Sequence, residues 1–202
     1  MVESLKLTHL YETLSLSCRR SSKNLSNKMK RFIIIILIIC GLEALLTIRS
    51  EAQTSVAQAQ AVFIYNFTRL IEWPADYKTG DFIIGVYGAG DVYNEIKNFT
   101  NGKSVGNQTI SVIKFASAQG ITKCHILFVP FGKTKELPTI LGTLAGAKTL
   151  IIGEKKGALE EGATINFVIV EDKLKFELKA GNATKYGLKI NSNLENMAIA
   201  KY

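Results

Sequence analysis

The sequence has little cysteine and histidine, with three cysteines and two histidines in 202 residues. Two of the cysteines and one of the histidines precede residue 53. Cys124 is therefore the single cysteine of residues 53–202, and His125 is their single histidine. One cysteine cannot close an internal disulfide. One cysteine and one histidine without neighbouring carboxylates do not make a zinc site either. We therefore expect no disulfide, no metal site and no cofactor in this part of the chain.

Catalytic patterns are also scarce. Cys124 and His125 are adjacent, which suggests a thiol–imidazole pair, but neighbouring residues of a strand point to opposite faces. Nucleophile and base usually come from positions that are distant in sequence. The interpretation we favour is a buried structural cysteine in a protein that is not an enzyme. An enzyme that uses Cys124 and His125 stays as an alternative.

Ligand-binding motifs for nucleotides and nucleic acids are missing as well. The stretch "GAGDVY" at 88–93 lacks the third glycine of the dinucleotide fingerprint, because Tyr93 stands there. No glycine-rich loop precedes a Lys-Ser or Lys-Thr pair. The net charge is +8 for the chain and +4 for residues 53–202, and only Lys155 and Lys156 are adjacent in that part. Scattered lysines do not form the clustered footprint of a nucleic-acid-binding protein.

Residues 1–52 differ from the rest of the chain. A basic run at 28–31 precedes an apolar run at 32–42, and Ser50-Glu51-Ala52 is a small-x-small pattern. This layout is typical of a secretory signal peptide, and the apolar run is shorter than the ~20 residues of a membrane span. We expect cleavage after Ala52 and a true start at Met29. A signal that stays uncleaved as a membrane anchor is the alternative.

Residues 53–202 are predicted to form a single α/β domain with a mixed sheet flanked by helices and a C-terminal β-hairpin. Strand and helix patterns alternate first and a hairpin follows, which favours this fold class. The expected elements are a helix over 56–73, strands over 82–87, 108–115, 125–131 and 148–154, helices over 92–99 (capped by Asp91) and 133–146, a hairpin over 163–180, and one or two short helices in 181–202.

The stretch "YNFTRLIEWP" at 65–74 contains the candidate contact residues. Two of its residues, Tyr65 and Trp73, have a polar tip near the end of the predicted helix, and such aromatics are enriched at protein interfaces. Core and interface are equally weighted for Trp73. Arg69 and Glu72 are three apart and can pair across one helical turn. We take Tyr65, Arg69, Glu72 and Trp73 as candidates for partner contacts.

Four motifs carry a family resemblance. "AVFIYNFTRLIEWP" at 61–74, "KCHILFV" at 123–129, "GATINFVIVEDKLKFEL" at 162–178 and "GLKINSNLENMA" at 187–198 resemble the YfiR family, which has a DUF4154-type domain. They occur in the family's order and extend from about 58 to 200. Asn191 replaces the first serine of the family's usual ending.

The resemblance implies a small exported protein of the bacterial periplasm without a catalytic role. YfiR-family members repress an inner-membrane diguanylate cyclase, YfiN, and so suppress cyclic-di-GMP synthesis and biofilm formation. Relatives form the sensory part of membrane histidine kinases. We therefore expect a periplasmic regulatory binding protein that controls such a partner, with a homodimer suggested by analogy. The alternative is a periplasmic module that binds a small molecule.

Overall fold

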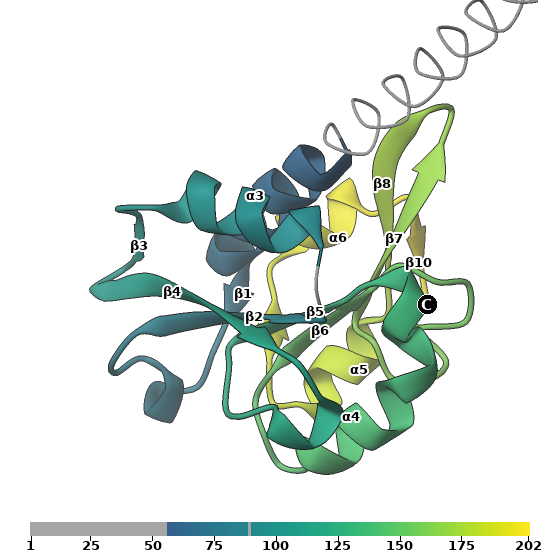
Figure 1. The fold of residues 1–202 in the computed structure, drawn as a ribbon. Helices are drawn as coiled ribbons and strands as arrows, with labels where there is room; N and C mark the ends of the chain where they lie inside the picture. The colour runs from purple at the N-terminus through teal and green to yellow at the C-terminus, as the bar shows by residue number, and fades with distance from the viewer. Residues whose placement is uncertain (1–55, 89) are drawn as a thin grey trace, which may run out of the picture. The chain divides into compact units, whose positions relative to one another are not determined.

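The computed structural model describes residues 56–88 and 90–202 (Figure 1). These residues belong to one compact unit that spans 53–202. The expected signal peptide, its cleavage after Ala52 and the start at Met29 lie outside the described residues. None of the helices in the described ranges has the length and hydropathy that a membrane span requires.

A mixed sheet of eight strands lies at the centre of the unit (Figure 1), in the order β10-β8-β7-β6-β5-β2-β4-β3. Five adjacent strands, β7, β6, β5, β2 and β4, are parallel to one another, and β8 pairs antiparallel with β7. The fold class predicted from the sequence is thus confirmed. The strands are β2 (Phe82–Tyr87), β3 (Ser104–Val105), β4 (Gln108–Phe115), β5 (Ile126–Val129), β6 (Leu150–Gly153), β7 (Ile165–Val170), β8 (Lys173–Leu178) and β10 (Ala200–Lys201).

Helices cover both faces of this sheet. The N-terminal helix (56–70) and α3 (Asp91–Thr100) lie on one side, and α4 (Leu137–Thr143) lies on the other (Figure 1). Shorter helices are α5 (Ala180–Lys185) and α6 (Ser192–Met197), and η2 (Ala75–Tyr77), η3 (Ala118–Gly120) and η4 (Phe131–Glu136) are 3-10 turns. The central strands are buried on both faces, as parallel strands between two helical layers must be.

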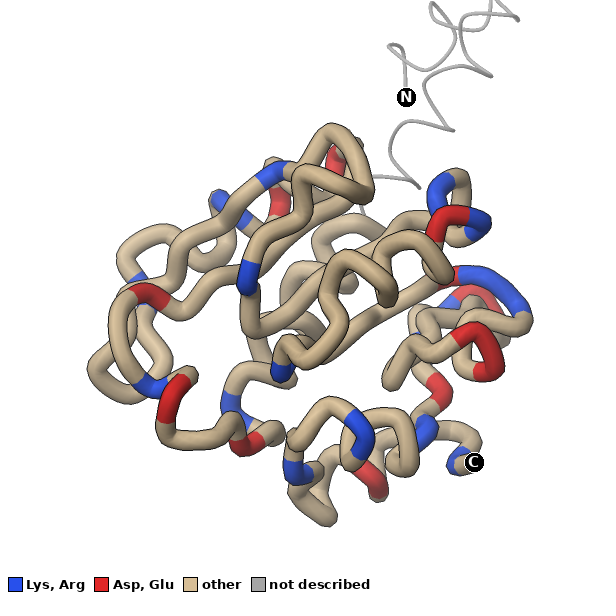
Figure 2. Tube along the Cα trace, turned by 90° about the horizontal axis from the view of Figure 1, so that it is seen from below, with Lys and Arg blue, Asp and Glu red and all other residues tan. Residues whose placement is uncertain are grey.

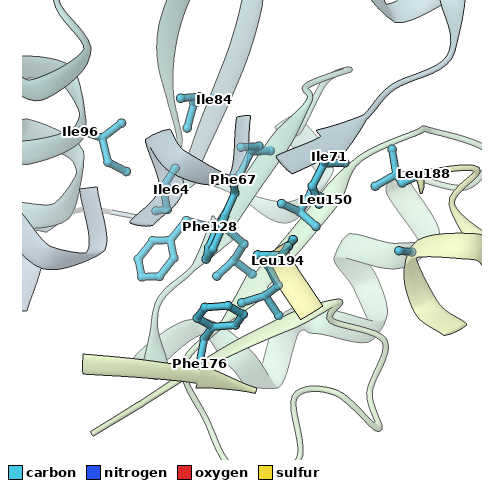
Figure 3. Packing of buried hydrophobic residues seen from close by; sticks show 14 of the residues in the cluster. Ile64, Phe67, Ile71, Ile84, Ile96, Phe128, Leu150, Phe176, Leu188 and Leu194 are labelled. Atoms are coloured by element: carbon cyan, nitrogen blue, oxygen red, sulfur yellow. The ribbon is translucent and has the colours of Figure 1, made fainter. Parts of the chain in front are cut away.

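The N-terminal helix contributes Phe67 to the hydrophobic core (Figure 3). Phe67 is fully buried; its ring meets Phe176 edge-on at 5.2 Å and stacks on Phe167 at 6.1 Å. Burying such a side chain is worth about 1.5–3 kcal/mol. Phe67 therefore anchors the helix to the β7–β8 hairpin.

The helix ends earlier than its hydrophobic periodicity predicts. It stops at residue 70, and β1 (Ile71–Glu72) then pairs antiparallel with β9 (Lys189–Ile190). The prediction of a helix up to Trp73 is therefore wrong by three residues. The partner strand comes from far along the chain and provides hydrogen bonds that local sequence does not reveal, while Pro74 favours an extended Trp73.

The C-terminal hairpin has the predicted position. Strands β7 and β8 are joined by Glu171 and Asp172, whose φ angles are 51° and 56°. Two central residues with positive φ define the type I′ turn that suits the twist of paired strands. The predicted short helices after this hairpin are α5 and α6, and Gly187 between them has φ 69°.

Candidate functional site

Three of the four predicted contact residues line one pocket at the end of the N-terminal helix. Arg69, Glu72 and Trp73 share it with Lys78 and with the turn between β3 and β4. Its volume is about 480 Å³. We call it the helix-end pocket; its lining consists of Thr68, Arg69, Ile71, Glu72, Trp73, Lys78, Phe82, Val105, Gly106, Asn107 and Gln108.

Trp73 is a buried wall of this pocket. Its side chain is 4% exposed and meets Phe82 edge-on at 5.1 Å between ring centroids. The indole Nε1 is buried and has no hydrogen-bond acceptor among the described residues. A buried indole N–H normally finds a partner, so the environment of this one is unusual. Trp73 is thus a buried residue that also lines the pocket, and its role as a partner contact stays a prediction.

Tyr65, the fourth candidate, holds Arg69 instead of lining the pocket. The guanidinium of Arg69 donates a hydrogen bond to the Tyr65 hydroxyl and lies 4.6 Å from the centroid of its ring. The Lys103 ammonium lies 4.7 Å from the same centroid. Tyr65 is itself buried. Tyr65 therefore contacts the side chains of both Arg69 and Lys103, and its hydrogen bond helps to fix the position of Arg69 in the pocket lining.

Glu72 pairs with Lys78 at 3.6 Å between Oε1 and Nζ. The sequence had predicted a different pair, between Arg69 and Glu72, because these residues are three positions apart and were expected on one helix. That geometry is lost because the helix ends at residue 70 and Glu72 lies on a strand. Both side chains of the observed pair are more than half exposed, so it contributes little to stability, about 0–1 kcal/mol. Two cations and one anion give the pocket a positive balance.

Sequence reasoning missed the far wall of the pocket. Gln108 donates hydrogen bonds from Nε2 to the carbonyls of Tyr77 at 3.0 Å and Gly80 at 3.2 Å, which ties the start of β4 to the loop after η2. Gly106, with φ 58°, shapes the turn from β3 to β4. The only sequence signal for this wall was the glycine at that turn. Lys78 had no signal because its position depends on how the strands pair.

Cys124 and His125 pack against different sets of residues. Cys124 is fully buried on one face, and burial raises the pKa of its thiol to about 12. On the other face, His125 Nδ1 accepts the Ile83 N–H at 3.0 Å, so Nε2 carries the proton and donates to the Tyr77 carbonyl at 2.7 Å. Burial lowers the pKa of His125, which stacks on Phe82 at 4.2 Å. The thiol packs in one hydrophobic cluster, and the imidazole packs against aromatic residues of the other.

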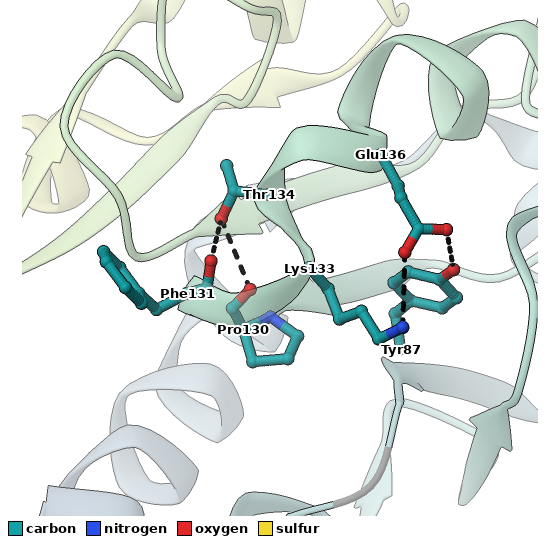
Figure 4. A network of polar contacts seen from close by, with 6 residues as sticks. All are labelled: Tyr87, Pro130, Phe131, Lys133, Thr134 and Glu136. Atoms are coloured by element: carbon teal, nitrogen blue, oxygen red, sulfur yellow. Dashed lines mark hydrogen bonds and ion pairs between the residues drawn. The ribbon is translucent and has the colours of Figure 1, made fainter.

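A second polar cluster lies where ligands bind in many open α/β sheets, at the carboxyl ends of β2 and β5 (Figure 4). The Tyr87 hydroxyl donates to Glu136, and the Lys133 ammonium lies 3.2 Å from the same carboxylate. Burial, followed by this hydrogen bond, raises the pKa of Tyr87. The polar groups of this cluster satisfy one another, so we place the candidate site at the helix-end pocket.

The described residues contain no group of three or more histidine, cysteine and carboxylate side chains that could hold a metal ion. Charged residues of both signs are interspersed along the chain (Figure 2). The arrangement at the helix-end pocket can bind, through two cations and apolar walls. It offers no nucleophile and base in contact.

A family model described as YfiR/HmsC-like, DUF4154, matches residues 57–199. No curated protein sequence matches the chain. Similar solved structures include a conserved domain protein from Vibrio cholerae O1 biovar El Tor, with 10% identity and a TM-score of 0.45 over 60% of this chain and 55% of that one. Another is the ABC domain in complex with L-Trp from Streptococcus pneumoniae, with 14% identity and a TM-score of 0.45 over 59% and 55%. The chain spans just over half of each, and likenesses of this size carry no functional argument.

Proposed function

Because the chain belongs to the YfiR/HmsC-like family, we propose that it is a periplasmic regulatory binding protein. It controls an inner-membrane signalling protein by binding the partner's periplasmic domain. The partner is a diguanylate cyclase of the YfiN type or a sensor histidine kinase, and control of the cyclase links the protein to cyclic-di-GMP and biofilm formation. The observation that carries this proposal is the family match over 57–199, nearly all of the described residues.

The described side chains support binding instead of catalysis. Cys124 is buried with a thiol that stays protonated at neutral pH, and both ring nitrogens of His125 are engaged by backbone groups. Replacing Cys124 with alanine is therefore expected to leave partner binding unchanged. Loss of a measured turnover in that variant would instead favour the enzyme alternative.

Regulation by binding requires a difference in affinity between two states of the partner. A protein that moves a sensor from 1:99 to 99:1 must bind the favoured state about 10⁴-fold more tightly. Such a difference needs contacts that exist in one state of the partner only. In this scheme the protein forms a 1:1 complex with its partner, so the effect on partner activity saturates at equal concentrations once both are well above the dissociation constant.

Export is part of the proposal. Residues 1–52 would direct secretion and be removed after Ala52, leaving 53–202 in the periplasm; an uncleaved anchor would keep the same domain on the membrane. N-terminal sequencing of the protein recovered from the periplasmic fraction tests this. A start at Gln53 is expected, and recovery from the cytoplasm with residues 29–52 attached would contradict it.

The partner is tested by cross-linking in envelope membranes. Full-length protein with a C-terminal affinity tag is expected to recover an integral membrane protein that carries a cyclase or kinase domain. The matched control is the tagged protein without residues 1–52, which stays in the cytoplasm. Equal recovery from both strains, or no signalling protein from either, would overturn the proposal.

A small-molecule ligand is the second candidate function, and the cations that line the helix-end pocket favour it. With Arg69 and Lys78 at the same pocket, the ligand class is a small anion with an apolar part. Trp73 is the chain's single tryptophan, so intrinsic fluorescence reports on this pocket directly. A panel of aromatic and aliphatic carboxylates is expected to change the emission of the wild type and not of Arg69→Gln/Lys78→Gln. An unchanged spectrum with every compound would contradict this candidate.

A further inference from the structure

One edge of the central sheet is only partly paired within the part of the chain that the structure describes. Strand β10 pairs with β8 at Glu177 and Leu178, and the Ile199 and Tyr202 N–H groups donate to the carbonyls of Phe176 and Leu178. Backbone groups of a strand point alternately to its two sides, so those of Leu174 point to this same outer side. Among the described residues, no strand pairs with 173–175 there. We call this stretch the open edge.

The two faces of the open edge differ in chemistry. Lys173 and Lys175 share one face of the hairpin. Leu174 lies on the other face opposite Ile169, whose side chain is 54% exposed. A strand added here would meet two ammonium groups on one face and an apolar surface on the other.

The apolar face of the open edge continues into a groove of about 330 Å³ between the hairpin and the start of the N-terminal helix. Phe167, Ile169, Leu174 and Val56 form its apolar walls. At its inner end the buried Gln60 donates from Nε2 to Glu154 at 2.9 Å. The groove can take an apolar side chain of a bound segment, which would give the open edge selectivity beyond backbone pairing.

Charge argues against a second copy of this chain as the occupant. Two β8 edges paired antiparallel about Leu174 would bring Lys173 of one copy opposite Lys175 of the other. Like charges directly opposite each other destabilise a strand pair. Acidic residues at those positions of a different chain would stabilise it. The edge lysines thus oppose self-association and favour one kind of partner strand.

We propose that the open edge binds an extended segment of a partner protein in which acidic and apolar residues alternate. The segment adds as a strand beside Lys173–Lys175, with its acidic side chains on the lysine face and an apolar side chain toward the groove. This inference rests on the proposed function, because it names the partner element that such a regulator would recognise.

The test uses the full-length protein and two fluorescein-labelled peptides, one alternating Glu and Val and one alternating Lys and Val. Fluorescence anisotropy is expected to show saturable binding of the Glu peptide, with affinity that falls as salt rises, and at least about tenfold weaker binding of the Lys peptide. Lys173→Glu/Lys175→Glu is expected to reverse this preference. Lys185→Glu/Lys189→Glu makes the same charge change away from the open edge and should keep the wild-type preference.

The backbone contribution is tested by Leu174→Pro. Proline at an edge position whose N–H faces outward removes no bond of the hairpin, so the fold should persist, which a circular dichroism melt checks. Binding of the Glu peptide is expected to be lost. If Leu174→Pro fails to fold, a Glu peptide with N-methylated valines replaces it as the test, and retained binding of that peptide would overturn strand addition.

Further results of these experiments would also overturn the proposal. One is equal binding of both peptides by the wild type. The other is a homodimer in sedimentation that Lys173→Glu/Lys175→Glu alters, because the open edge would then pair with a second copy. If the tagged Lys173→Glu/Lys175→Glu protein still recovers the membrane partner at wild-type yield, the proposed function stands and the open edge is wrong. If the wild type recovers the membrane partner and the Lys173→Glu/Lys175→Glu protein does not, the result supports both the proposed function and the role of the open edge.

Discussion

His125 couples the stability of the fold to pH. Its Nδ1 accepts a backbone N–H and its Nε2 donates to a carbonyl, so a second proton would break the bond to Ile83. The surroundings are the aromatic rings of Trp73, Tyr77 and Phe82, with Lys123 as the nearby charge. Burial lowers the pKa of this imidazole, and the backbone bond to Tyr77 opposes that shift only in part.

The sign of the pH effect follows from this lowered pKa. As the pH falls below about 6.5, the unfolded chain takes up the proton before the folded chain does. Stability is therefore full above about pH 6.5 and decreases as the pH falls toward the folded-state pKa of His125. Urea unfolding from pH 5 to 8 measures this loss.

His125→Gln is the matched control for that experiment. Glutamine can donate to the Tyr77 carbonyl but does not titrate. Glu154, whose pKa is raised by burial, contributes with the opposite sign, losing stability as the pH rises from about 4.5. That contribution is present in both proteins, so it cancels in the difference between them. A difference in unfolding free energy that is constant across pH 5 to 8 would refute the role of His125.

At the scale of elements, the N-terminal helix depends on one buried face. Phe67→Ala is expected to lower the free energy of unfolding by about 3–5 kcal/mol, because it leaves a cavity among Phe167, Phe176 and their neighbours. Val62, on the same helix, is 40% exposed, and Val62→Ala should change stability by about 0.5 kcal/mol or less. Chemical denaturation of both variants measures the contrast. Similar losses in the two variants would mean that the helix is not packed as described.

The β7–β8 turn offers a change that should stabilise the protein. Glu171 and Asp172 both have positive φ, which costs side-chain-bearing residues roughly 1–2 kcal/mol each, with aspartate at the lower end. Asn-Gly is the preferred pair for this turn type. Glu171→Asn/Asp172→Gly is therefore expected to raise the melting temperature by several degrees. The order-reversed control Glu171→Gly/Asp172→Asn should give a smaller rise; an equal or larger one would contradict the turn geometry.

Elements whose pattern is local were predictable from the sequence, and those made by distant pairing were not. The alternating runs around Glu171-Asp172 predict the hairpin because strand period and turn chemistry agree within one segment. The sequence predicted Trp73 to lie on a helix, which is wrong. The helix ends before it because β1 pairs with β9, and β9 lies over a hundred residues later, so the local pattern does not reveal the pairing. The same limit explains Lys78 and Gln108, which reach the helix-end pocket only through the order of the strands.

At the scale of the whole molecule, the strand order separates the two candidate binding regions. The helix-end pocket borders β2, β3 and β4, and the open edge is on β8. Five strand spacings separate β8 from β4, about 24 Å at the usual distance between strands. The strands between them, β7, β6, β5 and β2, are parallel to one another, and they contain buried residues such as Ile84, Leu127 and Ile151. A ligand in the pocket and a strand on the open edge can therefore be bound together.

This separation predicts additivity in a double-mutant cycle. Arg69→Gln/Lys78→Gln removes the cations of the pocket, and Lys173→Glu/Lys175→Glu reverses the charge of the open edge. If the two regions act independently, the effects on the free energy of binding the Glu peptide should add within about 0.5 kcal/mol. Anisotropy titrations of the wild type, both variants and their combination complete the cycle. A larger interaction energy would show that the sheet transmits a change between the pocket and the open edge, and each ligand would then alter the affinity for the other by the same factor.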